Sequence, residues 1–179
     1  MSTGRHTRLG RAAATWAFVG WGGVLLYAIV RLGAIAAEAL RQELTALHWT
    51  ALLGNVVLLA WAEGYRGFQH RFSPRAAARV LHLRQHATPL TALLAPFFCV
   101  GYLGATKRMV RATWRGTALI GLLIVIVHQM PQPWRGITDA GVVVGLSWGL
   151  VSFVVLTWRA LRTGRYPAAP EVPEGHPQR

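Results

Sequence analysis

The feature that most constrains this chain is the gathering of its apolar residues into long uncharged runs separated by basic segments. A helix of about 20 residues crosses the roughly 30 Å hydrocarbon core of a bilayer. The first and last runs reach that length, whereas the others need tilt or local thinning of the membrane. We expect membrane-embedded segments at 12–33, 46–62, 89–105, 114–130 and 138–158, of which 89–105 is either re-entrant or spanning.

A soluble helical core is the alternative, and it requires a polar face on each helix. Residues 119–127 read Leu-Ile-Gly-Leu-Leu-Ile-Val-Ile-Val and are apolar on all sides. Several tryptophans lie near the ends of the runs, where an amphipathic ring favours the headgroup zone: Trp16, Trp49, Trp61, Trp114, Trp134 and Trp158. The sequence therefore predicts an all-α fold, a polytopic transmembrane helical bundle.

Basic residues set the expected orientation, because cytoplasmic loops collect lysine and arginine. The chain has 19 basic and 6 acidic side chains, and most of the basic ones lie before 12, at 66–84, at 107–115 and after 158. These segments share one side only if 89–105 does not cross, and Pro89 and Pro96 favour a bend there. We expect four crossings plus this re-entrant element, with five crossings as the alternative, in a bacterial inner membrane with both termini cytoplasmic.

The predicted domain organisation is a basic cytoplasmic tail at 1–11, a helical membrane domain at 12–160 and a disordered, proline-containing tail at 161–179. Nucleic acid is not an expected partner, because the arginines are scattered between spans and no groove-binding module holds them. Anionic lipid headgroups are the expected counterpart of the basic loops.

An interfacial amphipathic helix is predicted at 74–86, with Ser73 as its cap and Pro74 in its first turn. Its alanine, valine and leucine side chains are expected to face the membrane, while its basic side chains remain exposed to water. The residues expected to contact lipid headgroups are Arg71, Arg75, Arg79 and Arg84.

Two sets of histidines are candidates for binding chemistry. His82 and His86 lie four residues apart on one helix face, and His70 and Glu63 are close enough in sequence to complete a divalent-metal site. The alternative for this set is contact with headgroups or phosphate. His48 and His128 lie near the outer ends of two spans in the four-crossing topology, where two imidazoles can hold haem b. A hydrogen-bonded or wetted histidine is the alternative there.

Gly141, Gly145 and Gly149 recur every four residues and form one stripe on the last span. Small residues at this spacing let another helix approach closely. The stripe predicts either a seam within the bundle, which the bundle's own packing favours, or a contact between copies of the chain.

Three blocks carry a resemblance to known proteins: EGYRGFQHRFSP from Glu63, LRQHATPLTALLAPFFCVGY from Leu83 and MPQPWRGITDAGVVVGLSWGLV from Met130. Together they resemble a group of small multi-span inner-membrane proteins of proteobacteria, over about residues 60–155. The resemblance implies the location and a helical membrane fold, and it carries over no catalytic residue.

Three functions are compatible with these features. The first is a non-catalytic accessory, scaffold or assembly component that binds a membrane protein partner or a second copy of the chain. The second is a haem b or metal redox protein that uses the paired histidines. The third is an enzyme or carrier that acts on lipid headgroups.

Overall fold

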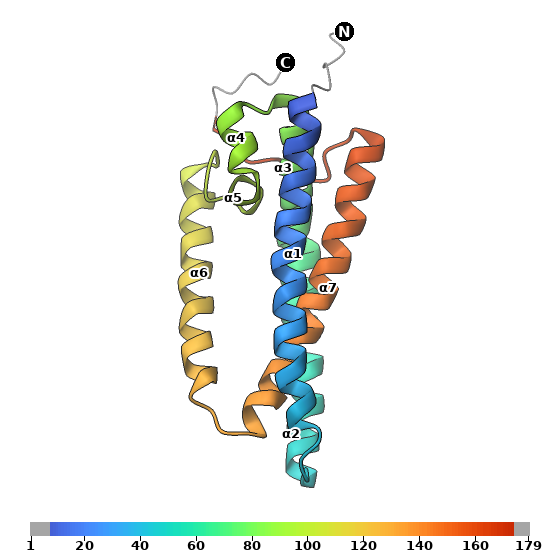
Figure 1. The fold of residues 1–179 in the computed structure, drawn as a ribbon, viewed down its shortest axis with the longest axis vertical. Coiled ribbons are helices and arrows are strands. Elements are labelled where there is room, and N and C mark those ends of the chain that lie inside the picture. Colours follow the sequence, from blue (N-terminus) through green and yellow to red (C-terminus); the bar gives the residue numbers. More distant parts are fainter. Residues whose placement is uncertain (1–7, 174–179) are drawn as a thin grey trace. The chain divides into compact units, whose positions relative to one another are not determined.

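The computed structural model describes residues 8–173, and within that range the chain forms helices and no strands (Figure 1). The elements in order are α1 (Arg8–Ala39), α2 (Ala46–Leu59), η1 (Ala60–Phe72), α3 (Ser73–His86), α4 (Pro89–Leu93), α5 (Ala95–Val100), α6 (Lys107–His128) and α7 (Trp134–Thr163). The element η1 is a π-helix, whose turns are wider than those of an α-helix. The chain is therefore helical without interruption from 46 to 86.

Three helices of the described chain are long and apolar enough to cross a membrane by length and composition, namely α1, α6 and α7. This confirms the predicted all-helical membrane class. The run at 89–105 instead forms α4 and α5, of 5 and 6 residues. Because about 20 helical residues are needed to cross, this run does not form a spanning helix.

The chain forms two compact units. Unit 1 contains residues 8–22, 73–116 and 153–173, and unit 2 contains residues 23–72 and 117–152. Both described ends of the chain therefore belong to unit 1. Each of α1, α6 and α7 contributes residues to both units.

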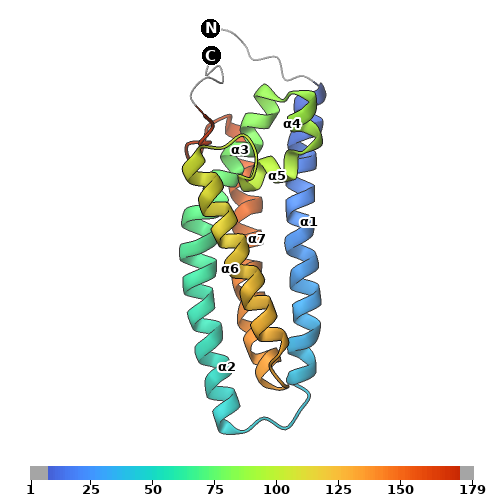
Figure 2. The same cartoon turned by 90° about the vertical axis from the view of Figure 1, so that its left-hand side faces the viewer.

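The centre of unit 1 is α3, in which every residue from 76 to 83 is buried. Gly10 of α1 packs directly against the backbone carbonyl of Arg84, where a Cβ atom has no room. The short helices α4 and α5 lie beside the first half of α1 (Figure 2), and Trp16 Nε1 donates to Leu93 O at 3.2 Å. Protein therefore covers α3 on all sides.

This burial corrects the prediction of an interfacial helix at 74–86. Three consecutive alanines, 76–78, lie on different faces of α3, and each is at most 1% exposed. Small side chains on several faces allow neighbouring segments to approach from several directions. The helix is consequently an internal element of unit 1, and not an amphipathic helix that rests on lipid.

The segment that follows α7 is placed against unit 1 as far as the structure describes it. Thr106 N donates to Glu171 O at 2.9 Å, and Tyr166 Oη donates to the side-chain oxygen of Gln85. The predicted disorder of the tail at 161–179 is therefore wrong for residues 161–173, of which 161–163 are the last residues of α7. Residues 174–179, and residues 1–7 of the predicted basic tail, lie outside the described part.

In unit 2, the glycine stripe of α7 lies against α2 and η1. A Cβ atom on Gly145 would lie 2.9 Å from the Glu63 carboxylate, and one on Gly149 would lie 2.5 Å from the Phe68 ring. Gly141 meets the Asn55 amide, whose Nδ2 donates to the α7 carbonyl of residue 137 at 2.8 Å. The stripe is thus a seam within the chain.

The π-helical form of η1 explains how this seam keeps its register. Glu63 and Phe68 are five residues apart, a spacing that turns two side chains away from each other on an α-helix. In a π-helix the backbone bonds run from i to i+5, so residues at this spacing point in more similar directions than they do on an α-helix. Both side chains can therefore face glycines of α7 that are four residues apart.

Candidate functional site

Arg79 lies at the centre of unit 1 and is 0% exposed. Its Nε donates to Phe98 O at 2.6 Å, and its Nη1 donates to Pro170 O at 2.7 Å. Its Nη2 donates to Leu103 O at 2.6 Å and to Gly104 O at 3.0 Å. The planar guanidinium thus fastens α3 to α5, to the turn after α5 and to the C-terminal segment.

The electrostatics of this centre follow from burial. Burial lowers the pKa of Arg79 to about 10, which leaves the guanidinium charged at neutral pH. Burial raises the pKa of the Cys99 thiol to about 12, against the opposing effect of the Arg79 charge. Cys99 Sγ donates weakly to Ala76 O at 3.7 Å. This cysteine is therefore a neutral buried thiol.

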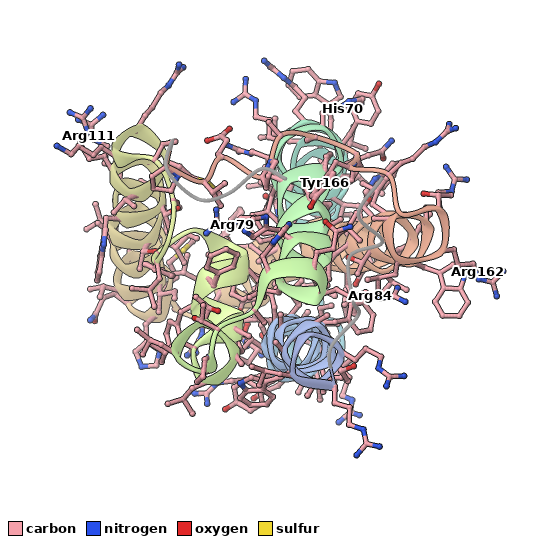
Figure 3. The ribbon with its side chains drawn as sticks, turned by 90° about the horizontal axis from the view of Figure 1, so that it is seen from above. His70, Arg79, Arg84, Arg111, Arg162 and Tyr166 are labelled. Atoms are coloured by element: carbon pink, nitrogen blue, oxygen red, sulfur yellow. The ribbon has the colours of Figure 1, made fainter. Side chains whose placement is uncertain are left out.

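The four arginines predicted to contact lipid headgroups have different environments. Arg71 is exposed, and Arg75 Nη1 lies 3.8 Å from the Glu171 carboxylate. Arg84 is half-buried, and its Nη1 donates to Leu161 O at 2.8 Å. For Arg79 the prediction is wrong, because backbone carbonyls occupy its guanidinium and no part of it reaches the surface (Figure 3).

The residues of the predicted metal set are only partly brought together. The rings of His82 and His86 lie 4.8 Å apart, and His82, which is 5% exposed, also stacks on Phe98. His70 packs edge-on against Tyr65. Within residues 8–173, no group of three or more His, Cys, Asp or Glu side chains is arranged to hold a metal ion. The four-residue site suggested by the sequence is therefore not assembled there.

Glu63 is a half-buried carboxylic acid on η1 that faces the middle of α7 at Gly145. It has no hydrogen bond or ion pair within the described range. The nearby Arg66 instead places its guanidinium 4.9 Å from the ring centroid of Trp61. Glu63 is thus a polar element of the helix seam.

The two histidines predicted for haem have separate roles in unit 2. The His48 ring lies edge-on against Trp134 with centroids 4.8 Å apart, and its Nδ1 accepts from Thr45 N at 3.2 Å. Thr45 and His48 thus form a capping box at the N-terminus of α2. His128 is the exposed last residue of α6. The structure gives His48 a capping role that its spacing in the sequence did not reveal.

Sequence reasoning missed two residues that lie with Arg84 around a cavity in unit 1. Arg11 belongs to a segment that the sequence marked only as a basic tail, and Thr157 lies inside an apolar run. Neither position carries a motif. A hydroxyl group in an apolar run, two residues before Arg159, is the one signal that the sequence offers for Thr157.

Comparison with protein families, with curated protein sequences and with solved structures found no match. The resemblance to small proteobacterial membrane proteins therefore stays a prediction.

Proposed function

We propose that this chain is an accessory or assembly subunit of the bacterial inner membrane, and that it docks α6 onto a transmembrane helix of a partner protein. The observation that carries the proposal is the exposure of α6. From 118 to 126, about two and a half turns, every residue is exposed, and Ile124 is 63% exposed. None of this stretch is used to pack its own chain.

Small residues and charge favour a protein partner of a particular kind. A Cβ atom on Gly116 or Gly121 would meet nothing within 4 Å, so another helix can come close at either position. The first half of α6 carries four exposed cations, namely Lys107, Arg108, Arg111 and Arg115. A second copy with the same orientation would bring like charges together. A partner with acidic residues at that membrane surface avoids this repulsion and gains attraction.

A photo-crosslinking amino acid at Ile124 tests this proposal in membranes of the native host. The matched control is Val30 on α1, in the same unit and 65% exposed. We expect a discrete heavier adduct from position 124 and none from position 30. Charge reversal at Arg108 and Arg111 should reduce the yield at least several-fold, because it removes the attraction at the membrane surface.

Three results would contradict the proposal. They are monomer alone at position 124, equal adducts from positions 124 and 30, and an adduct made of two copies of this chain. An adduct whose yield does not change on charge reversal would count against the acidic partner in the same way.

We further propose four crossings, made by α1, by α2 with η1, by α6 and by α7, with both termini cytoplasmic. The supporting observations are the helical continuity of α2 with η1 over 46–72, which is long enough to cross, and the positions of the basic residues. With four crossings the basic segments at 66–84, 107–115 and 159–165 all lie on one side, which the positive-inside rule makes the cytoplasmic side.

Reporter fusions after Arg111 and after Arg135 test this topology. An alkaline phosphatase fusion should be inactive at Arg111 and active at Arg135, because only the second position faces the periplasm in four crossings. Both a five-crossing chain and a chain in which only α1, α6 and α7 cross give the opposite pair. That opposite pair would overturn the proposed topology.

A further inference from the structure

Unit 1 contains a cavity of about 280 Å³ between the first turns of α1, the end of α3 and the last turns of α7. Its polar lining includes Arg11, Arg84 and Thr157, and its apolar lining includes Phe18, Trp158 and Leu161. Figure 3 shows Arg84 between α1 and α7. The cavity thus combines a cationic part with an apolar part.

Two hydrogen-bonding groups on its wall are buried without a protein partner. Thr157 is 1% exposed, and its Oγ1 forms no hydrogen bond within the described chain. Arg84 donates to Leu161 O through Nη1, but its Nε is buried and also forms no hydrogen bond there. A buried unsatisfied polar group costs about 1–3 kcal/mol. Two of them around one cavity indicate an occupant that accepts hydrogen bonds.

The charge of the lining selects an anionic occupant. Arg11 and Arg84 lie on different helices, and no acidic side chain lines the cavity. Guanidinium groups match phosphate oxygens in geometry as well as in charge. With the Thr157 hydroxyl, donors from α1, α3 and α7 surround one small space, which suits the several oxygens of a phosphate.

The apolar part of the lining favours a phosphate attached to a lipid over a free one. Phe18 and Trp158 offer ring surface that an inorganic ion does not use. Trp158 also lies at the end of the last apolar run, the depth at which tryptophan favours the headgroup zone. Ligand pockets for whole small molecules usually hold about 300–1,000 Å³. This smaller cavity suits a headgroup with the first carbons that follow it.

We infer that this cavity binds the phosphate headgroup of an anionic phospholipid. The phosphate accepts hydrogen bonds from Arg11, Arg84 and Thr157, and the adjoining carbons contact Phe18 and Trp158. This site is independent of the partner contact proposed for α6, since none of its residues belongs to that helix.

The test is a binding titration of the full chain in a neutral detergent. The probes are short-chain phosphatidic acid, phosphatidylglycerol, zwitterionic phosphatidylcholine and inorganic phosphate. We expect the two anionic lipids to bind, with phosphatidylcholine and inorganic phosphate at least tenfold weaker. Inorganic phosphate that binds as tightly as the lipids would overturn the lipid assignment. Equal binding of phosphatidylcholine would overturn the anionic assignment.

The decisive variant is Thr157→Val, which keeps the shape and removes only the hydroxyl. It should weaken phosphatidic acid binding by about tenfold, the loss expected for a hydrogen bond to a charged group, and Thr157→Ser should restore it. Thr163→Val is the matched control, because that exposed hydroxyl donates to Arg159 O on the same helix. Unchanged binding by a folded Thr157→Val protein would overturn the site.

A second pair of variants distinguishes binding in the cavity from nonspecific attraction of the lipid to basic residues on the surface. Arg11→Gln should weaken binding at least tenfold, whereas Arg165→Gln should leave it unchanged, since Arg165 is exposed and does not line the cavity. Equal losses from both variants would reduce the interaction to attraction by net charge and would overturn the proposed site.

Discussion

Replacing Arg79 by methionine should destabilise unit 1 by about 3–5 kcal/mol, the usual effect of removing one side of a buried charged network. Four backbone carbonyls lose their donor at once, and the bond to Phe98 O is buried. Arg79→Lys should also be strongly destabilising, because an ammonium has three donors on one atom and cannot span the same acceptors.

Cys99 provides the measurement, because it is the single cysteine of the chain and is buried beside Arg79. Maleimide should label it slowly in the native protein and at least a hundredfold faster in the Arg79→Met variant, since each 1.4 kcal/mol changes an opening equilibrium tenfold. Arg75→Met on the same helix is the control. Its partly exposed ion pair with Glu171 contributes about 0–1 kcal/mol. Equal labelling of wild type and Arg79→Met would refute the central role of Arg79.

Adding a single methyl group at Gly149 should destabilise unit 2 by about 1–3 kcal/mol. The new Cβ atom would lie 2.5 Å from the ring carbon of Phe68 that joins the side chain, so the ring cannot simply rotate away. Reversible unfolding in mixed micelles measures the change. The double variant Gly149→Ala with Phe68→Ala should show strong non-additivity, because the second change removes the clash.

For the control variant we expect the opposite effect on the stability of unit 2. Gly54 lies on α2 in the same unit, and a Cβ atom there would meet nothing within 4 Å. Gly54→Ala should therefore be neutral or stabilising by up to about 1 kcal/mol through helix propensity. Destabilisation of similar size at positions 54 and 149 would show that the seam is not the cause.

The sequence was sufficient for the class of fold, because long uncharged runs have few ways to be accommodated other than as membrane helices. The sequence also predicted the glycine stripe, since residues four apart lie on the same face of a helix. The partner of that stripe was not predictable. No pattern in residues 60–72 predicts a π-helix. The orientation of both Glu63 and Phe68 toward α7 depends on that π-helix.

The burial of α3 could not be predicted from the sequence, for a different reason. A pattern of arginines among alanines describes one helix, and it does not say which other segments will cover that helix. The acceptors of Arg79 come from residues 98, 103, 104 and 170, which are distant in sequence and are backbone atoms without any residue signature. Sequence reasoning therefore assigned to solvent a side chain that the fold encloses.

The composition of unit 1 from three separate stretches of chain has a consequence for biosynthesis. Residues 8–22 are synthesised before α3, yet the carbonyl of Pro170 that completes the Arg79 network is synthesised 91 residues after Arg79. Until then, the Arg79 guanidinium has an incomplete set of backbone acceptors. Unit 1 thus reaches its folded form only after the intervening residues of unit 2 have been synthesised.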